Sequence, residues 1–150
     1  MKRSRNDRQG VLDVMNAISR LNLQNLPDSL KGYEYSLIFQ SLACNTSIKK
    51  LYFLGDWSSV DLQRYLEGDL RGDVRPGTEN INLTDDDIWH LSNALQINSS
   101  LTSLRLYNAS ISDNGAKFLS EMLQVNTTIV DLGLSQNTIE SDGAKFLSQM

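Results

Sequence analysis

Cysteine and histidine are almost absent from this sequence, and long apolar runs are missing. The 150 residues include one cysteine, Cys44, and one histidine, His90. A single cysteine cannot form an internal disulfide, and no stretch approaches the roughly twenty apolar residues that a membrane-spanning helix requires. The first residues also lack the apolar core of a secretory signal. We therefore expect a cytoplasmic protein with no membrane insertion.

An excess of positive charge is also lacking. The chain has 14 basic and 18 acidic residues, which gives a formal net charge of -4. This balance gives no reason to expect nucleic acid as a partner. Four basic residues cluster near the start, at Lys2, Arg3, Arg5 and Arg8. We interpret residues 1–19 as a charged leader followed by a capping helix.

Asn-x-Ser/Thr triplets are present, but without an export signal they would not meet the glycosylation machinery. Five occur, at Asn45, Asn82, Asn98, Asn108 and Asn126. In three of these an apolar residue precedes Asn and two hydroxyl residues follow it. Asn tolerates the left-handed conformation that ends many helices, and hydroxyl groups can satisfy nearby backbone. We therefore expect these asparagines to have a structural role at helix ends.

An internal repeat is clear in the last third of the chain. A step of 28 residues places residues 101–122 on residues 129–150, and the sequence Gly-Ala-Lys-Phe-Leu-Ser recurs at 115–120 and 143–148. Self-similarity at such a period indicates stacked supersecondary units.

Within each unit the apolar pattern changes from strand-like to helix-like. Leu104 and Leu106 alternate as in a strand with one buried face, and three- and four-residue spacing follows after Gly115. Ser112 and Thr84 are expected to cap helices, and the three aspartates at 85–87 lie where negative charge favours a helix start. The sequence therefore predicts units of strand, turn, helix and turn.

The middle of the chain departs from this regularity. The strand of one unit should lie near residues 73–78, where Arg75-Pro76-Gly77 is poor strand material. We expect one domain over 20–150 with an irregular insertion near 68–82. The last unit stops partway at Met150, so self-association through an uncapped C-terminal unit is an expected option.

Two segments carry a leucine-rich pattern: Leu101-x-x-Leu104-x-Leu106 and Ile129-x-x-Leu132-x-Leu134-x-x-Asn137. This pattern resembles the ribonuclease-inhibitor-like leucine-rich repeats, a class also found in NOD-like receptors and the Ran GTPase-activating protein. The resemblance implies an α/β solenoid, a horseshoe of about four to five units with parallel strands on the concave face and helices on the convex face. It also implies that Asn137 bonds to turn backbone, which Ala109 at the equivalent position cannot do.

The sequence contains no catalytic set. His90 matches Phe118 in register, which favours a packed or surface histidine over a base. Cys44 matches Ile97, which favours a core cysteine. The run at 85–87 lacks the spacing of a calcium loop. We therefore expect neither an enzyme nor a cofactor or metal site.

The residues between the leucines of a strand should face outward. The best contact candidates are Lys49, Tyr52, Arg105, Tyr107 and Asp131, because tyrosine and arginine are enriched at binding hot spots. The sequence predicts a protein–protein interaction module that binds its partner through the concave sheet. Two alternatives stay open: a regulator of an enzyme, either inhibitor or GTPase activator, and a structural fragment or subunit of a larger leucine-rich-repeat receptor or assembly. Trp89, between core positions of its helix, is either packed or exposed.

Overall fold

The computed structural model describes residues 8–16, 20–22, 35–53 and 83–150. Strands alternate with helices along most of this chain. The elements are α1 (Arg8–Met15), β1 (Arg20–Asn22), α2 (Tyr35–Leu42), β2 (Lys50–Phe53), α4 (Asp85–Ile97), β3 (Ser103–Leu106), α5 (Asp113–Leu123), β4 (Asp131–Gly133) and α6 (Ser141–Leu147).

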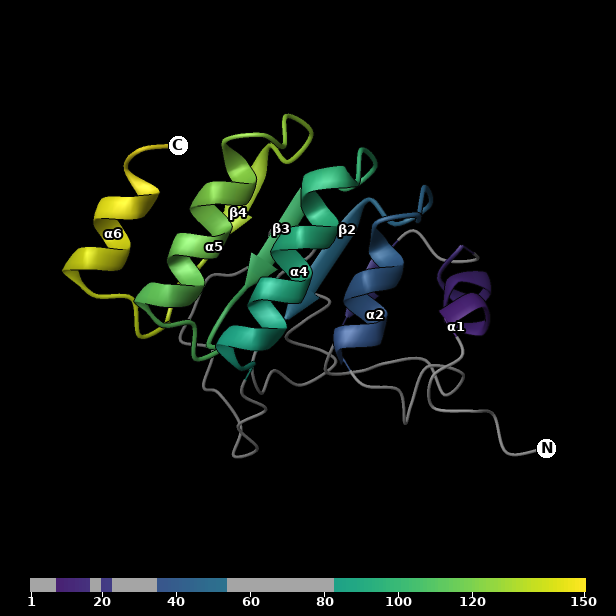
Figure 1. Ribbon diagram of the computed structural model, residues 1–150, viewed down its shortest axis with the longest axis horizontal. Coiled ribbons are helices and arrows are strands. Elements are labelled where there is room, and N and C mark those ends of the chain that lie inside the picture. The colour runs from purple at the N-terminus through teal and green to yellow at the C-terminus, as the bar shows by residue number, and fades with distance from the viewer. Residues whose placement is uncertain (1–7, 17–19, 23–34, 54–82) are drawn as a thin grey trace, which may run out of the picture.

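The strands form one parallel sheet in the order β1-β2-β3-β4. Leu51 of β2 pairs with Leu104 of β3, which pairs with Leu132 of β4. The helices stand side by side along one face of the sheet (Figure 1), and α2 packs on α4, α4 on α5, and α5 on α6. Parallel neighbours require a crossover connection, and the helices provide it.

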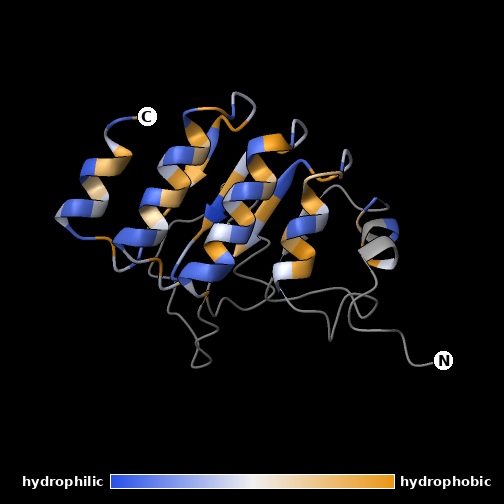
Figure 2. Ribbon diagram, viewed as in Figure 1, coloured by the Kyte–Doolittle hydropathy of each residue, from blue (hydrophilic) through white to orange (hydrophobic). Residues whose placement is uncertain are grey.

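The core lies between the sheet and the helices. The inward residues of the strands, Leu51, Phe53, Leu104 and Leu106, are completely buried. In Figure 2, α4 and α5 each carry both apolar and hydrophilic residues, as expected of amphipathic helices that cover a sheet. The inward position predicted for Leu104 and Leu106 is therefore confirmed, although burial does not alternate along β2 and β3, since Tyr52 and Ser103 are buried as well.

Both predicted helix caps are confirmed. Thr84 accepts a hydrogen bond from the Asp87 N–H, and the Asp87 carboxylate accepts one from the Thr84 N–H, which together make a capping box. The Ser112 hydroxyl accepts from the N–H groups of Asn114 and Gly115.

The asparagines at the helix ends are structural, but the expected conformation is wrong. Asn98 ends α4 with φ -65° and ψ 127°, an extended conformation rather than a left-handed one. Its function lies in its buried side chain, which donates to the carbonyl oxygens of Leu42 and Asn45 at 2.7 and 2.9 Å. It also accepts from the N–H groups of Ser100 and Leu101 at 2.9 and 2.8 Å. Each unit is therefore tied to the one before it.

Asn137 bonds to turn backbone as predicted, and it also serves the previous turn. Its side-chain oxygen accepts from the N–H groups of Ala109 and Ile111 at 2.9 and 3.1 Å. Its amide nitrogen donates to the carbonyls of Leu106 and Leu134 at 2.6 and 2.8 Å. The turn with Ala109 is thus satisfied by a side chain 28 residues later.

The predicted leucine-rich-repeat horseshoe of about four to five units is wrong. The described residues form a small α/β domain with a single open sheet of four strands, each three or four residues long. This is too few strands for a solenoid of that size. The sequence period specifies the local strand–helix unit, whereas a curved solenoid depends on how many such units stack.

Two further expectations concern single segments. Cys44 is exposed, so the prediction of a core cysteine is wrong: the residue falls in the turn after α2 rather than on its buried side. The predicted insertion near 68–82 lies outside the described residues. Within residues 8–16, 35–53 and 83–150, no helix combines the length and the apolar character that crossing a bilayer requires.

Candidate functional site

Alternation along three strands places one set of side chains on the sheet face opposite the helices. The pairing register arranges them in two rows across β2, β3 and β4. We call this set the strand face, and its residues are Lys50, Ser103, Asp131, Tyr52, Arg105 and Gly133. Lys50, Ser103 and Asp131 form one row, and the other three form the second.

Arg105 and Asp131 form the polar centre of the strand face. Arg105 Nε donates to Asp131 Oδ2 at 2.8 Å, and a terminal guanidinium nitrogen lies 2.7 Å from the same oxygen. The Ser103 hydroxyl donates to Asp131 Oδ2 at 2.7 Å. The side chains of Arg105 and Asp131 are 31% and 40% exposed, so both remain accessible to a partner.

These contacts determine the protonation of Asp131. Burial by itself would raise the pKa of this carboxyl group. The hydrogen bonds from Ser103 and Arg105, and the positive charges of Arg105 and Lys50, outweigh burial and hold the pKa below its ordinary value. Asp131 is therefore a stable anion near neutral pH that orients Arg105.

Gly133 provides the space in which the Arg105 side chain lies. A Cβ atom added at Gly133 would be 3.3 Å from Arg105 Cγ and 3.6 Å from its Cβ. The aliphatic part of Arg105 thus passes close to the backbone of β4, where a larger side chain would press against it.

The other predicted contact residues are less central. Tyr52 pairs in register with Arg105, yet it is only 3% exposed, so the expectation of a displayed tyrosine is wrong. Lys49 precedes β2, and its ammonium group donates to the Thr46 carbonyl at 3.0 Å. Tyr107 follows β3, is half-buried, and donates its backbone N–H to Phe53 at 2.7 Å. The structure brings Arg105 and Asp131 together and leaves Lys49 and Tyr107 at the two ends of the strands.

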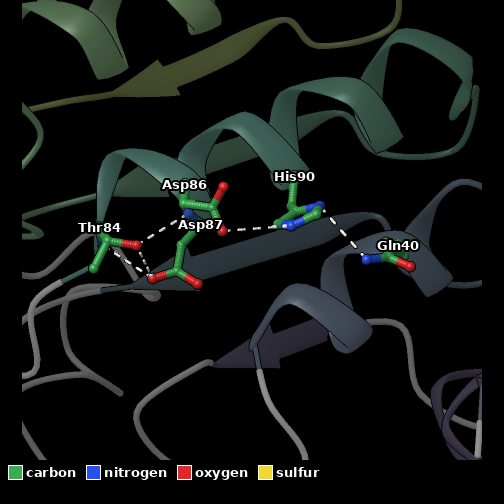
Figure 3. Close-up of polar contacts among 5 residues, drawn as sticks. All are labelled: Gln40, Thr84, Asp86, Asp87 and His90. Atoms are coloured by element: carbon green, nitrogen blue, oxygen red, sulfur yellow. Dashed lines mark hydrogen bonds and ion pairs between the residues drawn. The ribbon is translucent and has the colours of Figure 1, made fainter. Parts of the chain in front are cut away.

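The single histidine lies on the helix side of the molecule. His90 of α4 is 3.6 Å from the Asp86 carboxylate through Nε2 and 3.5 Å from Gln40 of α2 through Nδ1 (Figure 3). Both contacts lie at the helix surface, where Gln40 and Asp86 are exposed. Among the described residues there is also no group of three histidine, cysteine or acidic side chains that could hold a metal ion.

Sequence reasoning placed Ser103 on the outward strand face without selecting it as a contact candidate, and it did not predict that Ile97 is exposed. The signal for Ser103 was its position two residues before Arg105, which puts both on one strand face. Ile97 is 72% exposed at the end of α4, where helical periodicity gives no warning that an apolar side chain faces solvent. Of the two positions expected for Trp89, packed or exposed, the structure shows the exposed one, with 44% of the residue accessible.

The chain matches no protein-family model and no curated protein. Among solved structures it is similar to one titled "Leiomodin-1 Actin-Binding Site 2 (ABS2)", with a TM-score of 0.62 and 14% sequence identity. The match covers 95% of this chain and 68% of that chain. At this identity the similarity extends to the fold alone. The resemblance to ribonuclease-inhibitor-like proteins stays a prediction.

Proposed function

We propose that this chain is a protein-binding module and that the strand face holds the partner, with Arg105 as the main contact. The observation that carries the proposal is the Arg105–Asp131–Ser103 network, which holds a partly exposed arginine in one orientation. Arginine is among the residues most often dominant in interfaces, and a side chain already ordered loses less entropy on binding.

The similar solved structure supports a protein partner, because its title describes it as an actin-binding site. Actin is therefore the first partner to test. The enzyme-regulator alternative has no observation of its own in its favour among the described residues.

The experiment compares three forms of the immobilised chain: the natural sequence, Arg105→Ala, and Lys145→Ala. Lys145 is an exposed cation on α6, remote in sequence from the strand face, so Lys145→Ala is a matched loss of charge. Capture from a cell extract is followed by affinity measurement with each purified candidate, and actin is tested directly by co-sedimentation. We expect Arg105→Ala to weaken binding by about tenfold or more and Lys145→Ala to leave it unchanged.

Urea unfolding of Arg105→Ala provides the folding control. The exposed Arg105–Asp131 pair should contribute less than about 1 kcal/mol, so the variant is expected to stay folded. Equal affinity of all three forms for every captured protein would refute the proposed site. Co-sedimentation that depends on Arg105 would identify actin as the partner.

A further inference from the structure

A second surface lies on the opposite side of the molecule, between helices α2 and α4. It is a groove of about 360 Å³ whose lining includes Ala43 and Ala94 as small apolar residues and Trp89 and Ile97 as large ones. Gln40 and His90, the pair drawn in Figure 3, bridge the two helices at its polar side.

The apolar residues of this groove are exposed to an unusual degree. Trp89 is 44% exposed and Ile97 is 72% exposed. Trp89 also borders a neighbouring hollow with Phe118 of α5, so its ring is reached from both sides. Contiguous exposed apolar side chains at a concave surface are typical of interaction sites.

The two segments that form the groove carry charge of one sign only. Residues 35–48 contain no charged side chain, and residues 83–98 contain three aspartates and no lysine or arginine. Asp87 is committed to the capping box and Asp85 accepts a hydrogen bond from Ser112. The Asp86 side chain is 80% exposed, and His90 lies 3.6 Å away. Asp86 therefore presents a negative charge at the start of α4.

The groove ends at the exposed Ile97, and beyond its lining residue His90 lies Asp86, which belongs to the adjoining hollow that shares Trp89 with the groove. Asp86 and Ile97 are eleven positions apart on one helix, which corresponds to about 16 Å, or about three helical turns. A helical segment of the same length matches this span, and packing of an amphipathic helix into an apolar groove is a common mode of peptide recognition. The acidic charge favours a basic segment and disfavours an anionic membrane surface.

We propose that the groove between α2 and α4 docks a basic amphipathic helix of another protein. Apolar side chains of that helix fill the space over Ala43 and Ala94, between Trp89 and Ile97. A lysine or arginine of the helix pairs with Asp86. This site is independent of the strand face and of the function proposed for it.

The test uses a fluorescein-labelled helical peptide of leucine and lysine, about 15 residues long, with leucine at three- and four-residue spacing. A second probe has glutamate in place of lysine. Binding to the full chain is measured by fluorescence anisotropy. We expect saturable binding of the lysine peptide and at least about tenfold weaker binding of the glutamate peptide, because Asp86 attracts the former and repels the latter.

The 28-residue period supplies matched variants. Ile97 corresponds to Val125, which is 59% exposed two residues after α5, and Asp86 corresponds, two periods later, to Asp142 in the first turn of α6. Ile97→Ser should weaken binding of the lysine peptide by about tenfold, and Val125→Ser by less than about twofold. Asp86→Lys should weaken it by about fivefold, and Asp142→Lys by less than about twofold.

If Ile97→Ser and Val125→Ser, or Asp86→Lys and Asp142→Lys, weakened binding equally, the proposal would be overturned. Binding would then reflect nonspecific hydrophobic contact or net charge. Equal binding of the two peptides would also overturn the proposal. Light scattering tests whether a second copy of this chain occupies the groove instead. If the natural chain is a dimer and Ile97→Ser makes it a monomer, the proposal of a helix from another protein is overturned. Circular dichroism of each variant confirms that it is folded.

Discussion

Single asparagine side chains join neighbouring strand–helix units in this molecule. Asn126 repeats the bonds of Asn98 one unit later: it donates to the carbonyls of Leu95 and Asn98 at 2.6 and 3.1 Å. It accepts from the N–H groups of Thr128 and Ile129 at 2.9 and 3.0 Å. Each amide therefore satisfies backbone groups of two units that would otherwise be buried without a partner.

Asn98→Ala is expected to lower the free energy of unfolding by about 2–4 kcal/mol, because it leaves several buried backbone groups unpaired. Asn98 is 4% exposed, so water does not readily replace the lost amide. Urea unfolding at neutral pH measures the change. The control is Asn114→Ala at an exposed position of α5, which should alter stability by less than about 0.5 kcal/mol. A loss for Asn98→Ala as small as that of the control would contradict the structural role.

The lowered pKa of Asp131 predicts how the stability of the folded chain changes at acidic pH. Its pKa in the folded chain is below the ordinary 3.8, so near that pH the folded state binds fewer protons than the unfolded state. The stabilisation is therefore present above pH 3.8 and is lost as the pH falls below it. Because the side chain is 40% exposed, we expect less than about 1 kcal/mol.

The measurement is the difference in unfolding free energy between the natural chain and Asp131→Asn. This difference should be constant from pH 7 to pH 5 and should shrink as the pH falls below 3.8. An NMR titration of the Asp131 carboxyl carbon should give a pKa under the ordinary value. A measured pKa at or above 3.8 would show that Arg105 and Ser103 do not stabilise the Asp131 carboxylate.

At the scale of elements, close approach of neighbouring helices depends on a glycine. Gly115 lies in the first turn of α5, where an added Cβ would be 2.8 Å from the Ile111 side chain and 3.4 Å from Asp85 Oδ1 of α4. Ile111 is completely buried and has little freedom to move. The glycine thus allows α5 to lie close both to the turn before it and to α4.

Gly115→Ala is expected to destabilise the chain by about 1–3 kcal/mol through overpacking. At an unhindered helix position, a change from glycine to alanine ordinarily stabilises the helix, because alanine exceeds glycine in helix propensity by up to about 1 kcal/mol. Thermal and urea unfolding distinguish the two outcomes. If Gly115→Ala were more stable than the natural chain, this would refute the inference that the start of α5 is too closely packed to accept a Cβ atom.

On the scale of the whole molecule, the described elements differ in how many neighbours they have. In the sheet, β2 and β3 have a strand on each side, whereas β4 is an edge strand. Helices α4 and α5 pack between two others, while α6 packs on α5, and most of its residues are exposed. Stability should therefore decrease from the centre of the described sheet toward β4 and α6.

Amide hydrogen exchange tests this gradient. Backbone amides of β2, β3, α4 and α5 should exchange slowest, and those of α6 should exchange at least about tenfold faster. Uniform protection from α4 to α6 would indicate a single cooperative unit instead.

The two proposed binding surfaces lie on opposite sides of the molecule. The strand face presents Arg105 and Asp131, and the groove between α2 and α4 presents Trp89 and Ile97, with Asp86 in the adjoining hollow. Because the helical layer separates them, a change such as Ile97→Ser should leave binding at Arg105 intact. The two proposals can therefore fail independently.

The sequence by itself determined the local elements. Apolar periodicity located β3 and the helix that follows Gly115, and Thr84 and Ser112 marked helix starts, because capping and burial of one face depend on near neighbours in the chain. It also pointed to Arg105 and Asp131 as surface residues and contact candidates.

Only the tertiary structure decided what depends on residues distant in sequence. The burial of Tyr52, the exposure of Cys44 and Ile97, and the open four-stranded sheet in place of a horseshoe were all missed. The same holds for the bonds of Asn98, whose partners lie 53 and 56 residues away. Periodicity specifies which side of an element is apolar, whereas exposure and the partners of a side chain are set by what packs against it.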